Sequence, residues 1–122
     1  MLDVARWGLG VEFPETVAAA GGKHFFQDDQ ETPDTLNVQY GFAGKTITWE
    51  HRLWSNHAQE GRSAATAFYG ERGTLIVDRS GWKVYGGSAA QSSSGDLLSD
   101  HLQNFLHAVQ TRQSPLCDAL SA

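Results

Sequence analysis

The chain has 122 residues, a formal net charge of −5 at pH 7 and a single cysteine. This length suits one domain over residues 1–122 that can bury a cooperative core. The nine Lys and Arg residues are scattered, so we exclude the basic stripe by which proteins bind nucleic acid. No apolar run approaches the ~20 residues needed to cross a bilayer, which excludes a membrane span.

Targeting and redox signals are sparse. The sequence begins without a basic region ahead of an apolar run, so we predict no signal peptide within it. Cys117 has no second cysteine to pair with, and the fold must therefore be held by packing. We expect a cytoplasmic location over an exported one, with any export signal lying upstream of Met1.

The first residues predict the end of an amphipathic helix. Residues 2–7 form it, and Gly8 and Gly10 close it. With barely two turns and no N-cap, such a helix is too short to be stable without heavy packing or an earlier part. Residues 11–20 predict a strand, in which Pro14 suits the beginning or an edge position.

Period-two alternation in the middle of the chain predicts an antiparallel hairpin. Apolar side chains alternate with polar or small ones from residue 35 to 42, and residues 46–53 repeat the pattern after Ala43 and Gly44. Two such runs around a short glycine-containing connection are typical of paired strands with one buried face. His51 occupies an inward position of the second run.

A second block of strands follows. β-Branched and aromatic residues separated by glycine-containing turns predict a meander over residues 65–69, 74–78 and 82–85. Residues 86–95 (GGSAAQSSSG) read as a linker-like loop.

The last element is a helix. Asp96 can cap it, and Arg112 lies in its last turn ahead of Pro115. Its apolar stripe at helical spacing comprises Leu98, Leu102, Phe105 and Val109. Strands followed by one helix predict an α+β fold: a predominantly antiparallel, open-faced β-sheet with one long covering helix near the C-terminus. Residues 116–120 start another apolar-periodic segment, and both ends look cut from a longer protein.

Motifs for catalysis are scarce. No G-x-G-x-x-G stands at a strand-to-helix turn, and the glycines at residues 70–73 fit a turn between strands. No pair of histidines has metal-binding H-x-x-x-H spacing; His51 is either a ligand or proton relay, or a half-buried histidine bonded to a neighbour. The acidic residues 27–31 fit a solvated connection better than a calcium loop. The four Trp side chains suit either sugar stacking or a core or interface.

Four strings follow one another along the chain: residues 3–10 (DVARWGLG), 21–35 (with GGK and DDQETPDT), 68–75 (FYGERGTL) and 101–108 (HLQNFLHA). They resemble the C-terminal domain of the Gfo/Idh/MocA family, which includes glucose–fructose oxidoreductase and inositol dehydrogenase. The first resembles the end of the family's H-x-x-D-x-x-R-W helix, and the third its F-x-G-x-x-G-x-L hairpin. The resemblance covers nearly the whole chain.

The resemblance implies that this chain is the substrate-binding and oligomerisation domain of an NAD- or NADP-dependent oxidoreductase acting on a sugar or polyol. Family members carry an N-terminal dinucleotide-binding domain, and their catalytic Lys, Asp and His lie ahead of the segment that matches residue 3 onward. The resemblance thus implies no catalytic, cofactor-binding or metal-binding residue in this chain, no activity for the isolated fragment, and a homodimer through the open sheet face.

The candidate substrate-binding residues are Asp3, Arg6, Trp7 and His51. The resemblance gives Asp3 a supporting role, orienting the upstream histidine by a hydrogen bond, while Arg6 and Trp7 anchor the helix to the sheet. Two alternatives remain open at this point. One is a stand-alone carbohydrate- or protein-binding module, and the other, ranked last, is a metal-dependent hydrolase, which needs at least three convergent ligands.

Overall fold

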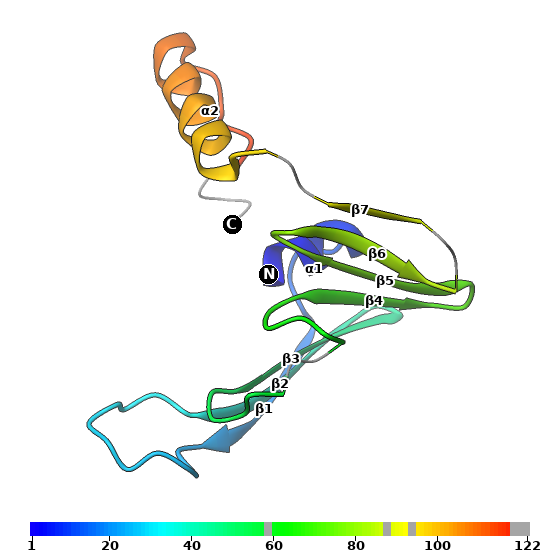
Figure 1. The fold of residues 1–122 in the computed structure, drawn as a ribbon, viewed down its shortest axis with the longest axis vertical. Helices are drawn as coiled ribbons and strands as arrows, with labels where there is room; N and C mark the ends of the chain where they lie inside the picture. Colours follow the sequence, from blue (N-terminus) through cyan, green and yellow to red (C-terminus); the bar gives the residue numbers. More distant parts are fainter. Residues whose placement is uncertain (58–59, 87–88, 93–94, 118–122) are drawn as a thin grey trace.

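The computed structural model describes residues 1–57, 60–86, 89–92 and 95–117, and within them the chain forms two antiparallel sheets and two helices (Figure 1). The elements in chain order are α1 (Leu2–Leu9), β1 (Thr16–Gly22), β2 (Thr35–Phe42), β3 (Lys45–Arg52), β4 (Thr66–Gly70), β5 (Gly73–Asp78), β6 (Gly81–Tyr85), β7 (Ala90–Ser92) and α2 (Leu97–Thr111). The sheets have the orders β1-β2-β3 and β4-β5-β6-β7, so every strand pairs with its neighbour in the sequence. The α+β class with antiparallel sheets and a C-terminal helix is confirmed.

Helix α1 lies against both sheets. It ends as predicted at Gly10, which adopts φ 62° and donates its backbone N–H to the carbonyl of Trp7 at 3.1 Å. A Cβ on Gly8 would stand 2.5 Å from the nearest atom of the Phe68 ring of β4, so the absent side chain lets helix and sheet approach closely. The Thr66 hydroxyl of β4 also donates to the carbonyl of Met1 at 3.1 Å.

The three-stranded sheet contains the predicted hairpin. Strands β2 and β3 pair through Ala43 and Gly44, and the apolar positions of the two strands lie opposite one another, as in the Val38–Trp49 pair. Strand β1 adds an edge, but it begins at Thr16 instead of residue 11. The start is delayed because Pro14 has no N–H to donate, and the first bond to β2 comes from the N–H of Glu15.

The four-stranded sheet contains the predicted meander and one strand that the sequence did not indicate. Strands β4, β5 and β6 pair in sequence, and β7 then pairs with β6 within the segment expected to be a loop. The composition of β7 is small and polar, so its pairing depends on the backbone of β6 and not on alternating side chains. Ile76, in the centre of this sheet, is 1% exposed.

Helix α2 corrects one expectation, that it would cover the sheet. Its Asp96 cap is confirmed, because the carboxylate accepts the N–H of Ser99 at 3.2 Å. In the part of the chain that the structure describes, however, α2 packs on no strand and stands apart from both sheets (Figure 1). The segment after it folds back instead, where the N–H of Leu116 donates to the Asn104 side chain at 2.9 Å. Most of the predicted segment 116–120 lies outside the described residues.

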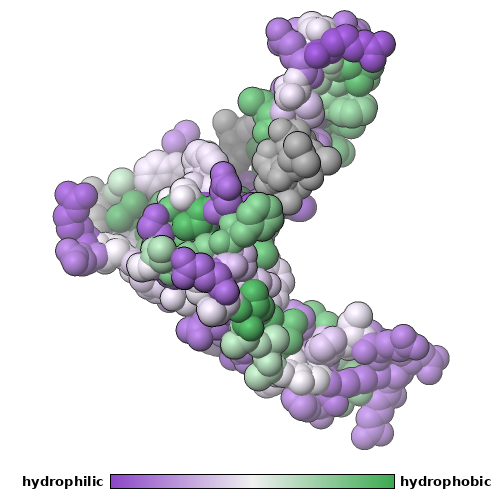
Figure 2. Space-filling model, turned by 180° about the vertical axis from the view of Figure 1, so that it is seen from behind, coloured by the Kyte–Doolittle hydropathy of each residue, from purple (hydrophilic) through white to green (hydrophobic). Residues whose placement is uncertain are grey.

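The chain exposes far more surface than a self-contained domain of its mass. Its accessible area is 9,630 Å², whereas a compact monomer of 13.3 kDa exposes about 6,500 Å². The buried apolar residues are few: Ala5, Val38, Ile47, Ile76 and Ala108. Much of the apolar content therefore faces solvent in this forked arrangement (Figure 2).

The close approach of β1 to β2 generates a test of the fold. A Cβ on Gly21 would stand 2.8 Å from the backbone Cα of Leu36, which cannot move aside without shifting the strand. We expect Gly21→Ala to lower the free energy of unfolding by about 2 kcal/mol in urea titrations. Gly70→Ala is the matched control, because its Cβ would lie 3.4 Å from the nearest atom. Equal stability of the two variants would contradict the packing described for β1.

Candidate functional site

The structure divides the four candidate residues between the two ends of β3. Asp3, Arg6 and Trp7 lie on α1, whose last turn meets the beginning of β3, where the Lys45 ammonium donates to the carbonyl of Leu9. His51 lies six residues further along the same strand, about 20 Å away at the rise of a β-strand. The structure therefore brings the three helical residues together and leaves His51 apart from them.

Arg6 and Trp7 do not anchor α1 to the sheet as expected. The Arg6 Nε–H donates to the carbonyl of Glu12 at 3.0 Å, and its guanidinium lies 6.0 Å from the centre of the Phe13 ring. Arg6 thus holds the segment that leaves the helix. The Trp7 side chain is 84% exposed, and Asp3 is also exposed, in the first turn. The close Gly8–Phe68 approach holds the helix instead.

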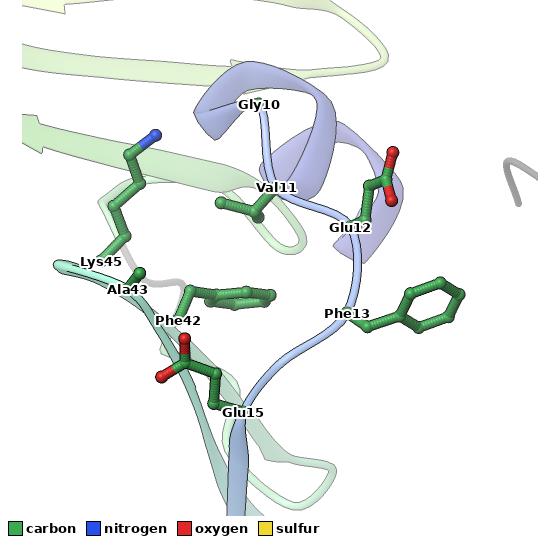
Figure 3. Close-up of a pocket in the computed structure, with 8 residues that line it drawn as sticks. All are labelled: Gly10, Val11, Glu12, Phe13, Glu15, Phe42, Ala43 and Lys45. Carbon is green, nitrogen blue, oxygen red and sulfur yellow. The ribbon is translucent and has the colours of Figure 1, made fainter.

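A hollow of about 450 Å³ lies where this exit segment passes the turn between β2 and β3 (Figure 3). Phe42 and Val11 point into it, Glu15 and Lys45 stand at its edge, and Phe13 points away. The hollow is open to solvent on one side. Its lining combines the aromatic ring of Phe42 with the carboxylate of Glu15 and the ammonium group of Lys45.

At the opposite end of β3, both ring nitrogens of His51 have partners. Its Nδ1 accepts the indole N–H of Trp49 at 3.2 Å, which places the proton on Nε2, 3.2 Å from the carbonyl oxygen of Pro33. The two rings meet edge to face at 6.4 Å. Of the alternatives for His51, the structure therefore favours a histidine bonded to its neighbours over a metal ligand or proton relay.

Aromatic side chains gather beside this histidine. Phe25 stacks on Trp54 with ring centres 5.7 Å apart, and Phe26 meets Phe25 edge to face at 5.2 Å. The Trp54 indole N–H donates to the hydroxyl of Thr35 at 2.9 Å, which fixes the ring. Phe25 is 62% exposed and Trp54 40%, so the stacked pair presents an apolar platform to solvent.

The residue that organises this end of the sheet is Asp34, which sequence reasoning passed over. It is 1% exposed, and its carboxylate accepts the backbone N–H groups of His24, Phe25 and Phe26 at 2.8 to 3.1 Å and the Thr35 hydroxyl at 2.8 Å. Its position directly before a strand, after a proline, was a usable signal. An aspartate there is placed to accept N–H groups of a neighbouring turn.

The environment of Asp34 lowers its pKa. Burial alone would raise the pKa, but the donated N–H groups of Phe26, His24 and Phe25, with the Thr35 hydroxyl, outweigh burial and hold it well below the ordinary value of 3.8. Asp34 is therefore ionised at neutral pH and serves as a structural anion. A carboxylate whose oxygens are so fully occupied has no capacity left to act as a general base.

The other acidic residues that the structure describes show no arrangement for metal binding. In the predicted acidic connection, Asp28 forms an ion pair with Lys23 at 2.6 Å, which leaves that carboxylate engaged with a cation of the chain. Among the residues that the structure describes, no group of three or more His, Cys, Asp or Glu side chains could hold a metal ion. The metal-dependent hydrolase interpretation thus gains no support from them.

Comparisons with known protein families, with curated proteins and with solved structures find no match to this chain. Among the described residues, no helix is both long and apolar enough to span a bilayer.

The low pKa of Asp34 predicts a specific dependence of stability on pH. Because the folded state depresses the pKa, the contribution of Asp34 is complete above about pH 4, the unfolded value, and is lost as the pH falls through the folded value. We expect Asp34→Asn to be less stable than the parent at pH 7 in urea titrations, with the difference shrinking below pH 4. Asp29→Asn, in the exposed part of the same connection, is the control and should follow the parent throughout.

Proposed function

We propose that this chain is the substrate-binding and oligomerisation domain of a larger NAD- or NADP-dependent oxidoreductase that acts on a sugar or polyol. The observation that supports the proposal best is the unpaired apolar surface: the chain exposes 9,630 Å², about half as much again as a compact monomer of its mass. A domain with so much uncovered surface is one that packs against other domains or subunits. The four strings that resemble the Gfo/Idh/MocA family give the class of partner.

The first of these surfaces is the outer side of α1. Trp7 is 84% and Phe13 81% exposed, and both belong to or directly follow the helix whose sequence resembles the H-x-x-D-x-x-R-W segment. Large aromatic side chains in this state are typical of the centres of interfaces. We assign this surface to the N-terminal dinucleotide-binding domain, which would bring the cofactor to the Asp3 end of α1.

The second surface is the apolar face of the three-stranded sheet, which we assign to a homodimer. Residues that share this face by their register include Val17, Val38 and Trp49. Val38 is buried within the chain, whereas Val17 is 57% and Trp49 36% exposed. An amphipathic sheet whose apolar face stays exposed at positions such as Val17 and Trp49 can pair with a second copy of itself about a twofold axis.

In this arrangement the chain supplies a binding surface that positions the substrate, and the reacting groups belong to the cofactor and to the N-terminal domain. A nicotinamide cofactor carries the hydride when it is bound by the N-terminal domain. Asp3 would orient the upstream histidine through a hydrogen bond, and the chain would form one wall of the substrate pocket. The isolated chain is accordingly inactive.

The decisive experiment is to sequence the DNA on both sides of the coding region and to express any longer reading frame. We expect an in-frame upstream segment with a G-x-G-x-x-G after a predicted strand, and reduction of NAD or NADP at 340 nm by the longer protein with a sugar or polyol. The 122-residue chain should show no turnover. Turnover by this chain alone, or a longer protein without a dinucleotide-binding motif, would overturn the proposal.

Trp7 gives a more local test of the same proposal. Because its side chain is 84% exposed, Trp7→Ala should change the free energy of unfolding of the isolated chain by less than about 0.5 kcal/mol. In the longer protein we expect the same substitution to lower the melting temperature and kcat/KM by disturbing the docked domain. Tyr69→Ala, which removes an aromatic side chain that is 68% exposed on β4, is the control and should leave both values unchanged.

A second candidate function is a stand-alone carbohydrate-binding module, and the stacked Phe25–Trp54 pair favours it. An exposed, fixed aromatic face can stack on the apolar face of a sugar ring. Titration of the isolated chain with mono- and oligosaccharides, followed by tryptophan fluorescence, separates the two functions. Saturable binding that Trp54→Ala removes and Trp7→Ala preserves would favour the module.

A further inference from the structure

Helix α2 carries an exposed apolar seam with the spacing of a helix–helix interface. Leu98, Leu102, Phe105 and Val109 follow one another at intervals of four, three and four residues, the a/d spacing of a heptad repeat. Leu106 widens the seam on one side. These five side chains, the α2 seam, are between 49% and 68% exposed, and Figure 2 shows hydrophobic residues along one side of this helix.

The described residues after α2, 112–117, leave the seam uncovered. They fold back beside Asn104, where they are held by the N–H of Leu116, and Ala108 is buried on that side of the helix. At 100° per residue, Asn104 and Ala108 lie on a stripe that is well separated from the seam. Within the described residues no strand contacts α2 either.

We propose that the α2 seam pairs with the α2 seam of a second copy of this chain, in antiparallel orientation. The area fits a helix pair: five half-exposed side chains offer on the order of 500 Å² per copy, or about 1,000 Å² in all, the lower bound for a specific interface. The spacing fits as well, because a narrow a/d seam is filled by the knobs of another helix.

Charge determines the direction of the pair. Asp96 and Asp100 lie at the beginning of α2 and Arg112 follows its end. A parallel pair would set the acidic ends side by side, whereas an antiparallel pair sets each acidic end against the partner's arginine and also opposes the two helix dipoles. The seam pairs Leu98 with Val109 and Leu102 with Phe105 about a twofold axis level with residues 103 and 104, and this axis also brings Asp96 of each chain close to Arg112 of the other.

This interface is separate from the sheet face assigned above to a homodimer. Two different isologous interfaces on one chain join four copies into a closed assembly when their twofold axes are perpendicular. The α2 pair therefore extends the proposed oligomer from two copies to four. The helix interface does not depend on the sheet interface, and each can be removed alone.

Sedimentation equilibrium of the whole chain tests the pairing. We expect Leu102→Asp to halve the assembly mass, or to weaken association at least tenfold, because it places a charge in the centre of the seam. His107→Asp adds a negative charge on the side of α2 opposite the seam, at 100° per residue, and should leave the mass unchanged. Circular dichroism of both variants controls for loss of helix.

Cross-linking tests the direction of the pair independently of folding. In a Cys117→Ser background, chains carrying Leu98→Cys are mixed with chains carrying Val109→Cys and oxidised. An antiparallel pair joins residue 98 of one chain to residue 109 of the other, whereas a parallel pair joins like residues. Predominance of like-residue products, or no cross-linked product, would overturn the proposal.

The outcomes also separate this proposal from the sheet interface. If Val17→Asp leaves the mass unchanged and Leu102→Asp halves it, the sheet dimer fails and the α2 pair stands. If Leu102→Asp has no effect on the mass, the α2 pair is wrong. In that case, hydrogen exchange of the α2 backbone amides distinguishes two explanations. Slow exchange would mean that α2 is covered by a sheet of its own chain, and fast exchange would mean that it is covered only when another domain is present.

Discussion

The buried carboxylate of Asp34 is the interaction on which the three-stranded sheet depends. The carboxylate accepts three consecutive backbone N–H groups, those of residues 24–26. The backbone carbonyl of Asp34 in turn accepts the N–H of Leu53, just beyond β3. One residue thus joins the end of β1, the start of β2 and the exit of β3. Through Thr35 it also fixes the Trp54 ring on which Phe25 stacks. The position of the aromatic platform therefore depends on hydrogen bonds that Asp34 makes to backbone N–H groups and to Thr35, and not on hydrophobic packing.

The uncovered surfaces have a common physical origin. Helices α1 and α2 and the hairpin strands β2 and β3 are amphipathic, yet the three-stranded sheet and α2 extend away from the centre of the molecule in different directions and neither covers the other (Figure 1). Among the described residues, helices and strands that are not paired in a sheet meet only where α1 contacts β3 and β4. The apolar surface that stays exposed on α1, on the sheet face and on α2 could lower its free energy by becoming buried against other surfaces.

Sequence reasoning succeeded where one local pattern decides the structure. Alternation predicted β2 and β3, and Asp96 predicted the start of α2. It failed where the answer depends on distant groups: β7 pairs with β6 through its backbone, and among the described residues α2 packs on no strand although it carries an apolar stripe. The candidate site shows the same division. His51 was placed correctly in its strand, but its bonds to Trp49 and Pro33, and the role of Asp34, come from tertiary contacts that no spacing encodes.

The strand orders β1-β2-β3 and β4-β5-β6-β7 have a consequence for how this chain acquires its structure. Every ladder joins sequence neighbours, so no strand waits for a segment made much later, and the loops to be closed are short. Each sheet can then form during synthesis, as soon as its last strand has left the ribosome. Both sheets can therefore be complete before α2 has been made, because β7, the last strand, precedes this helix in the chain.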